Sequence, residues 1–179
     1  MVSKAAKIGA LKEKGTRLAN QGRLPEAEAV FSRALILSKR DVDVLLALST
    51  IHGMRGDYAA AEKLLSRAIH VNPELAAAHY NLGMAQKCLG NLQGAAASYE
   101  KAIRYKPGIA GYHNNLGNVL LELNNLDRAV ECFKRALELA PDAPDYHYNL
   151  GNALKAGGLR HGAVTAFNNA LKFRPGFAA

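Results

Sequence analysis

The stretch YHNNLGNVLLE, residues 112–122, sets four amide or imidazole side chains among leucines. Closely similar stretches occur as AHYNLGMAQ from Ala78 and as YHYNLGNAL from Tyr146. The triplet Asn-Leu-Gly shared by all three begins at Asn81, Asn115 and Asn149, at intervals of 34 residues. A fixed period of this length is the signature of a repeat architecture, so the phrase belongs to a repeating unit and not to a single site.

The period extends along the chain and predicts five units, with residues 1–7 as an N-terminal extension of the first helix and residues 178–179 as a C-terminal stub without a capping helix. The units are 8–41, 42–75, 76–109, 110–143 and 144–177. Aligning them places similar residues in columns: Gly15, Ser49, Gly83, Gly117 and Gly151; Ala27, Ala61, Ala95, Ala129 and Ala163; Phe31, Leu65, Tyr99, Phe133 and Phe167; Ala34, Ala68, Ala102, Ala136 and Ala170; and Pro73, Pro107, Pro141 and Pro175.

The columns also predict the local structure of each unit. In unit 110–143, apolar residues recur at helical spacing in two stretches separated by the segment NNLD. The corresponding corners of other units carry glycine, which adopts a left-handed backbone without cost, and Asn124 takes that place here. The proline column follows the second helix and cannot continue it. Each unit is therefore predicted to be helix, tight turn, helix, and stacked units form an all-α solenoid because one hairpin cannot bury both its faces.

These columns resemble the tetratricopeptide repeat, a helical hairpin of 34 residues, over 170 of the 179 positions. Units 76–109, 110–143 and 144–177 match best, and the first two units depart from the pattern at Lys14, at Ser49 and where Ser38-Lys39 replaces the proline. The resemblance implies a right-handed superhelix of five helix–turn–helix repeats. In that geometry the first helix of each hairpin lines a concave groove and the second covers the convex side.

The resemblance places the asparagine column on the groove floor, one residue per unit. Asn118 and Asn152 follow three residues later on the same helix face. Amide side chains donate and accept hydrogen bonds, which suits the repeating N–H and C=O groups of an extended peptide. The column resembles the asparagine ladder in the repeat arm of O-GlcNAc transferases, although common ancestry within the family is an alternative reason for it. The predicted peptide-binding residues are Asn81, Asn115, Asn149, Asn118, Asn152, Tyr80, Asn114, Tyr148, Met84 and Lys87. Toward the N-terminus Glu13 and Ala47 interrupt the ladder, and Leu46 and Met54 add apolar area.

The histidine column, His79, His113 and His147, is interpreted as structural. Equivalent atoms in adjacent units lie about 10 Å apart, whereas zinc holds its ligands at about 2 Å, so the column cannot share one ion. No phosphate-binding loop, zinc-protease motif or nucleophile elbow occurs, so the sequence predicts neither catalysis nor a cofactor. The Lys, Asn and Arg clamp of chaperone-binding relatives cannot be assembled either, because Thr16 and Ala47 stand where Lys12 needs its partners.

Composition limits the remaining hypotheses. Hydrophobic residues make up 49% of the chain, charged residues 21%, and the net charge is +8. No apolar run approaches the roughly 20 residues that cross a bilayer. Cys88 and Cys132 form no disulfide or metal pattern and are expected to be reduced, which favours a cytoplasmic location.

Three functions compete. The leading hypothesis is a protein–protein interaction scaffold, not an enzyme, that binds an extended peptide or a partner helix in its groove. The alternative is the substrate-selecting arm of a larger enzyme, a glycosyltransferase or sulfotransferase. RNA binding is disfavoured because the groove face carries few cations, mainly Lys12, Lys87 and Lys155. Apolar residues on the last helix also predict self-association through the C-terminal repeat.

Overall fold

The computed structural model describes residues 3–178, whose regular elements are ten α-helices and one short 3-10 helix, with no strand. The all-α prediction is confirmed, and ten helices fit five hairpins. The predicted extension at residues 1–7 is described from Ser3 onward, and residue 179 of the predicted stub lies outside the described residues.

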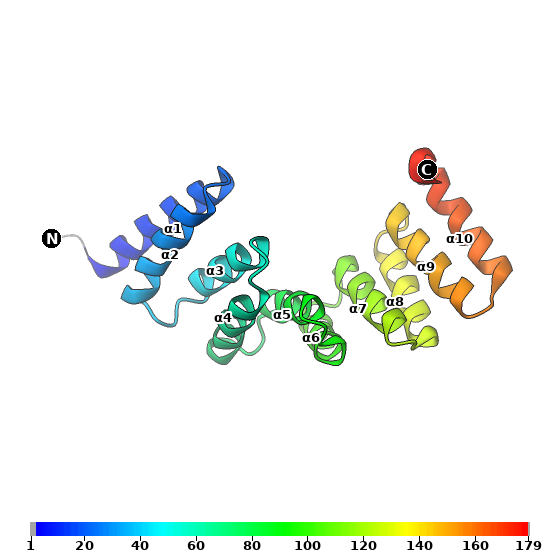
Figure 1. Ribbon diagram of the computed structural model, residues 1–179, viewed down its shortest axis with the longest axis horizontal. Helices are drawn as coiled ribbons and strands as arrows, with labels where there is room; N and C mark the ends of the chain where they lie inside the picture. Colours follow the sequence, from blue (N-terminus) through cyan, green and yellow to red (C-terminus); the bar gives the residue numbers. More distant parts are fainter. Residues whose placement is uncertain (1–2, 179) are drawn as a thin grey trace. The chain divides into compact units, whose positions relative to one another are not determined.

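The chain divides into two compact units between Leu89 and Gly90, each larger than one 34-residue repeat and called unit 1 and unit 2 from here on. Figure 1 labels their helices. Unit 1 contains α1 (Lys4–Asn20), α2 (Leu24–Leu37), α3 (Val42–Met54), α4 (Tyr58–Val71) and α5 (Ala76–Cys88). Unit 2 contains α6 (Leu92–Tyr105), α7 (Ala110–Glu122), α8 (Leu126–Leu139), α9 (Pro144–Ala156), α10 (Arg160–Phe173) and the 3-10 helix η1 (Pro175–Ala178).

The tight corners between helices have the backbone that the sequence predicts. Four of them carry glycine with φ between 74° and 79°, at Gly22, Gly56, Gly90 and Gly158. Asn124 occupies the fifth corner with φ 57°. The left-handed conformation lets the chain leave one helix and begin the next within a few residues.

Several helices begin at a polar side chain that accepts a hydrogen bond from the first turn. These N-caps are Ser3 for α1, Asp41 for α3, Asp57 for α4 and Asn91 for α6. Such a cap satisfies a backbone N–H that has no partner inside the helix. The helix starts are therefore fixed locally, before packing adds its contribution.

Packing within a hairpin depends on the small-residue column and the large apolar column. A Cβ atom added at Gly15 would lie 2.8 Å from the Phe31 ring, and one added at Gly117 would lie 2.7 Å from the Phe133 ring. The first helix of each hairpin can approach the aromatic ring of the second only because no side chain intervenes. Phe133 is fully buried as a result.

The second helix of a hairpin also packs against the next hairpin. In unit 1, Val30 and Phe31 of α2 share one buried cluster with Val44, Leu48 and Ile51 of α3. This continuity is what a solenoid requires, because each hairpin buries the face that its neighbour leaves open.

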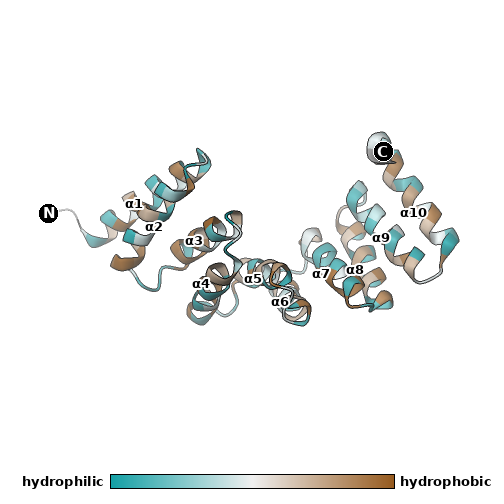
Figure 2. Cartoon of the chain, viewed as in Figure 1, coloured by the Kyte–Doolittle hydropathy of each residue, from teal (hydrophilic) through white to brown (hydrophobic). Residues whose placement is uncertain are grey.

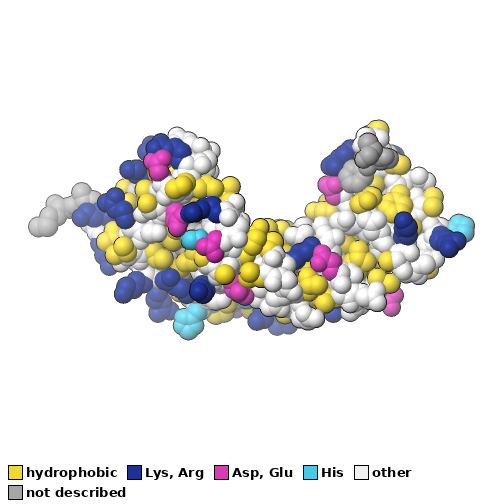
Figure 3. Space-filling view, in the orientation of Figure 1, with side chains coloured by type: hydrophobic (Ala, Val, Ile, Leu, Met, Phe, Trp, Pro, Cys, Tyr) yellow, Lys and Arg dark blue, Asp and Glu magenta, His cyan; other side chains and the backbone are white. Residues whose placement is uncertain are grey.

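Hydrophobic and hydrophilic residues are mixed along the helices (Figure 2). No helix within residues 3–178 is long and apolar enough to cross a membrane. The Lys and Arg side chains visible in Figure 3 are most numerous on unit 1. Residues 1–40 hold nine basic and three acidic residues, which accounts for that excess.

Candidate functional site

The first helices of neighbouring hairpins lie side by side within each unit. In unit 1, α1 contacts α3 and α3 contacts α5, and in unit 2, α7 contacts α9. We call the surface that these helices present the first-helix face of each unit. Its side chains include the predicted asparagine column, so each unit is considered separately below.

In unit 2 the first-helix face carries a chain of hydrogen-bonded amides. Asn149 of α9 donates through Nδ2 to Oδ1 of Asn114 on α7, at 2.9 Å. Asn114 in turn donates through its own Nδ2 to Oδ1 of Asn115, at 3.4 Å. The three amides link the two first helices and hold the half-buried Asn149 in one orientation. The bond uses one of the two N–H groups of Asn149 and does not involve its carbonyl oxygen.

Asn114, one of the predicted peptide-binding residues, lies between the two first helices. Its side chain is only 8% exposed and is engaged at both amide atoms by Asn115 and Asn149. Its hydrogen bond with Asn149 connects α7 with α9 and fixes the orientation of the Asn149 amide. The sequence could not show this, because the direction of the side chain depends on the neighbouring helix.

The other predicted residues of unit 2 remain accessible. Asn115, Asn118, Asn149 and Asn152 are all of intermediate exposure. Tyr148 is 41% exposed and its ring leans on Phe167 of α10, with the ring centroids 5.6 Å apart. The unit therefore presents several amides and one supported aromatic side chain on the same helices.

In unit 1 the first-helix face contains a cavity of about 310 Å³ between α3, α4 and α5. The predicted residues Asn81 and Met84 line it, whereas Tyr80 and Lys87 are half-buried and do not. The full lining is Ser49, Thr50, Gly53, Met54, Tyr58, Ala61, Leu65, Asn81, Met84, Ala85 and Cys88.

Sequence reasoning missed Tyr58 and Cys88 as part of this cavity. The two side chains form a hydrogen bond with each other, which raises the pKa of the Tyr58 phenol. Leu65 could have indicated a cavity near these two residues, because it is the one residue of its column without an aromatic ring. A smaller side chain at that column leaves space beside it.

Each histidine of the column makes the same hydrogen bond to a backbone carbonyl. Each Nε2 lies 2.8 Å from the carbonyl oxygen of a proline six residues earlier, His79 with Pro73, His113 with Pro107 and His147 with Pro141. A carbonyl oxygen only accepts, so Nε2–H donates. The bond fixes the turn before each first helix to the helix itself, which gives the histidine column a structural role.

Lys12 is held by acidic residues of the next hairpin. Its Nζ lies 2.5 Å from Asp43 and 3.3 Å from Asp41, the N-cap of α3. The hydrogen bond to Asp43 is the main reason that the pKa of Lys12 is raised. The ammonium group therefore ties α1 to α3 and already has two carboxylate partners.

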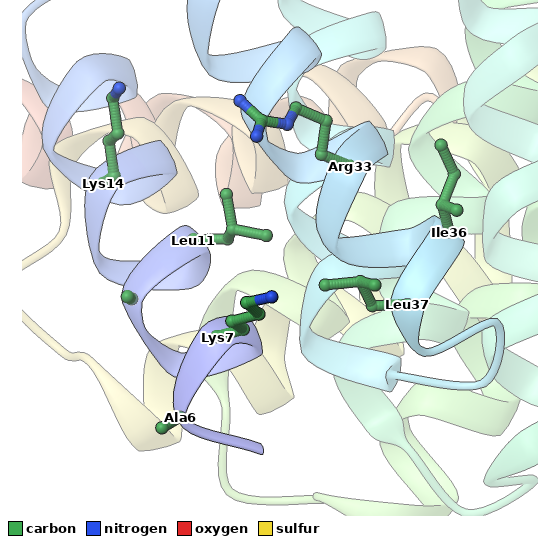
Figure 4. A pocket seen from close by; sticks show the side chains of 8 residues that line it. Ala6, Lys7, Leu11, Lys14, Arg33, Ile36 and Leu37 are labelled. Carbon is green, nitrogen blue, oxygen red and sulfur yellow. The ribbon is translucent and has the colours of Figure 1, made fainter. Parts of the chain in front are cut away.

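A second cavity, of about 590 Å³, lies between α1 and α2. Figure 4 shows that its lining side chains come from both helices, with Leu11 and Leu37 apolar and Lys7, Lys14 and Arg33 cationic. None of the predicted site residues lines it. It lies on α1 and α2 alone, away from the asparagine column.

Two segments of the chain match the tetratricopeptide repeat family, residues 46–110 and residues 117–158, the latter described as a TPR repeat. The chain is a tetratricopeptide repeat protein. No curated protein sequence matches it.

Solved structures show the same fold over nearly the whole chain. A crystal structure of MamA protein has a TM-score of 0.88 at 23% identity, covering 96% of this chain and 93% of that one. MamA 41-end from Desulfovibrio magneticus RS-1 has a TM-score of 0.89 at 19% identity, covering 97% and 98%. YrrB, described as "a TPR protein with an unusual peptide-binding site", has a TM-score of 0.82 at 20% identity, covering 93% and 86%. The tetratricopeptide solenoid fold is thus confirmed.

Proposed function

We propose that this tetratricopeptide repeat protein is an interaction scaffold whose first-helix face binds an extended peptide. The observation that carries the proposal is the amide chain Asn149–Asn114–Asn115, which orients accessible amides along the face of unit 2. A preoriented amide loses less conformational freedom on binding than a mobile one.

The spacing of the amides matches the main chain of an extended peptide. Neighbouring helices pack about 10 Å apart, and a strand rises about 3.3 Å per residue. One asparagine of the ladder therefore meets about every third peptide residue. A partner helix rises only about 1.5 Å per residue and hides its main-chain groups inside, so side-chain amides suit it less well.

Aromatic and structural evidence supports the same function. Tyr148 sits beside the amides of unit 2, and a tyrosine offers large contact area together with a polar tip. YrrB, of the same fold, is described as having a peptide-binding site. No charged clamp is needed for this mode, which agrees with the engagement of Lys12 by two carboxylates.

Selection from a displayed library of random linear peptides tests the proposal. Affinities of the selected peptides are then measured by fluorescence anisotropy for the wild type, for Asn118→Ala combined with Asn152→Ala, and for Asn168→Ala. Asn168 is an exposed asparagine of α10, a second helix, and is the matched control. We expect the double variant to bind about tenfold more weakly or worse and the control to bind as the wild type does. Failure to select any peptide, or an equal loss in the control, contradicts the proposal.

A second candidate is the substrate-selecting arm of a larger enzyme, such as a glycosyltransferase or sulfotransferase. The asparagine column favours it, because it resembles the ladder of O-GlcNAc transferase repeat arms. The same peptide chemistry would then choose the enzyme's protein substrate. A catalytic domain encoded in the same reading frame supports this candidate, and a stop codon directly after Ala179 excludes it.

We also propose that the chain associates with itself through α10. Leu159 and Val164 are 60% and 58% exposed on this last hairpin. Exposed aliphatic side chains favour association because water is released from them.

We propose, finally, that the protein works in a reducing compartment, the cytoplasm. This proposal is supported by Cys88 and Cys132, which are both free thiols.

A further inference from the structure

The small-residue column and the large apolar column form matched pairs inside the hairpins. In three hairpins the pair is glycine with phenylalanine: Gly15 with Phe31, Gly117 with Phe133, and Gly151 with Phe167. A Cβ atom at these glycines would lie 2.8, 2.7 and 2.5 Å from the respective ring. The ring thus fills the space above the glycine completely.

In the hairpin of α3 and α4 both members of the pair are different. Ser49 stands in the glycine column and Leu65 in the aromatic column. Ser49 is turned toward its own helix, where its hydroxyl donates to the Leu46 carbonyl at 2.7 Å. Leu65 has no ring to extend across the gap. Both residues are buried and form part of the inner wall of the cavity of about 310 Å³, where no aromatic ring projects into it.

This cavity opens onto the first-helix face of unit 1. Its lining includes Met54 and Met84, whose side chains are 66% and 45% exposed. Two exposed methionines beside an apolar cavity are typical of a binding surface that adapts to its ligand. Asn81 also lines the cavity, so an amide of the ladder lies next to the apolar opening.

The chemistry of the lining specifies the occupant. None of the lining residues carries a charge, and a charged group buried there would lose its hydration without a partner. The volume is at the lower end of ligand pockets, which span about 300–1,000 Å³. It accommodates a single large side chain better than a cofactor.

We propose that this cavity is a specificity pocket that takes one uncharged, bulky side chain of the bound peptide, aromatic or long aliphatic. The partner side chain enters the cavity from the first-helix face. Asn81 then meets the peptide main chain beside it. The pocket deepens the proposed peptide-binding function and rests on it for the main-chain contacts.

The sister hairpins provide the variant that tests this pocket. Ser49→Gly combined with Leu65→Phe recreates the pair found in the hairpins of α1–α2, α7–α8 and α9–α10. In this variant, called the filled variant, a phenylalanine ring projects from the inner wall and obstructs the cavity. Ser66→Phe adds a phenylalanine to the exposed side of the same helix and is the matched control. Thermal unfolding verifies that both variants are folded.

The readout uses Met54 and Met84, two of the three methionines of the chain. Their 13C-labelled methyl groups are followed by NMR while N-acetyl-phenylalaninamide, N-acetyl-leucinamide, N-acetyl-aspartamide or N-acetyl-glycinamide is added. We expect the phenylalanine and leucine compounds to shift both methyl signals in the wild type and in Ser66→Phe. The aspartate and glycine compounds should not shift them, and the filled variant should bind at least about tenfold more weakly.

Equal shifts from the aspartate compound, no shift from any compound, or undiminished binding to the filled variant overturns the pocket. The result is independent of the proposed function, because the single capped residues need no ladder contacts. If the capped residues shift the methyl signals but no peptide is selected from the library, the proposed function is contradicted and the pocket is not. If the selected peptides bind the filled variant and the wild type with equal affinity, the pocket is contradicted and the proposed function is not.

Discussion

Asn124 takes the left-handed backbone conformation that glycine takes at four other corners, with φ 57°. A side chain other than glycine or asparagine costs roughly 1–2 kcal/mol there because its Cβ crowds the following carbonyl. We expect Asn124→Ala to lower the free energy of unfolding by that amount, and Asn124→Gly to leave it unchanged or raise it by less than about 1 kcal/mol.

The neighbouring Asn125 is the control for this prediction. It precedes α8 with φ −91° and makes no side-chain cap bond. Asn125→Ala should therefore change stability by less than about 0.5 kcal/mol. Chemical denaturation of the three variants checks the account, and an equal cost for both alanine substitutions contradicts it.

The two cysteines should differ sharply in reactivity. Burial raises the pKa of the Cys132 thiol to about 11, whereas Cys88 is exposed. The thiolate is the reactive form, so at pH 8 Cys132 should react with a disulfide reagent roughly a hundredfold more slowly than an ordinary thiol of pKa about 8.5. Its rate should continue to rise with pH toward pH 11. Measurement on Cys88→Ala and Cys132→Ala separates the two thiols, and a rate for Cys132 that levels off below pH 9 refutes the assignment.

The sequence predicts the conformation of a residue when equivalent positions in the repeat carry the same signal. It does not predict contacts that a side chain makes with a neighbouring helix. The left-handed Asn124 follows from the glycines at equivalent corners, and the structure confirms it. Asn114 belongs to a column with no consistent chemistry, Lys12, Leu46, Tyr80, Asn114 and Tyr148. Only the position of α9 shows that Asn114 is buried and bonded to Asn149. That the asparagine column binds peptide stays a prediction.

Helix packing is most sensitive to substitution where the aromatic ring of one helix lies directly against a glycine of the other. Gly117 of α7 faces the Phe133 ring, and a Cβ atom there would lie 2.7 Å from it. Phe133 is fully buried, so its ring cannot turn out into solvent without exposing apolar surface. We expect Gly117→Ala to lower the free energy of unfolding by about 1–3 kcal/mol, the usual cost of overpacking.

Gly9 of α1 provides the same substitution without the ring. An added Cβ atom at Gly9 meets nothing within 4 Å. Gly9→Ala should raise the free energy of unfolding by about 0.5–1 kcal/mol, because alanine favours the helix. Thermal unfolding of the two variants measures the contrast. A gain in stability from Gly117→Ala contradicts the account that the Phe133 ring packs against Gly117 without room for a Cβ atom.

Whole elements were more predictable than the cavity between them. Periodicity, corners and the proline column are local signals, and they predict the ten helices that the structure contains. The cavity depends on Ser49 and Leu65 together, each of which is acceptable in its own column. Only the structure shows that they line one opening together with Tyr58 of α4 and Met84 of α5.

The last hairpin presents apolar surface that its own helices do not cover. Val164 is 58% exposed and Phe173 is 43% exposed, although Phe173 stacks on His147 with ring centroids 5.5 Å apart. We expect the wild-type chain to associate in a concentration-dependent way and Val164→Lys to weaken this association about tenfold, since one buried valine contributes about 1.5 kcal/mol or more. Light scattering measures the mass.

The adjacent exposed residue Thr165 is the control, because Thr165→Lys adds the same charge one position along α10. It should associate as the wild type does. A wild-type chain that is monomeric at all concentrations contradicts self-association through this face.

The central claim is that the first-helix face holds a peptide in extended form. A crystal structure of the protein with a peptide selected from the random library tests it most directly. The account predicts an extended main chain along α7 and α9 that hydrogen-bonds to the amides of Asn115 and Asn149. A peptide bound along the second helices α8 and α10, or bound as a helix with no main-chain contact to either asparagine, contradicts it.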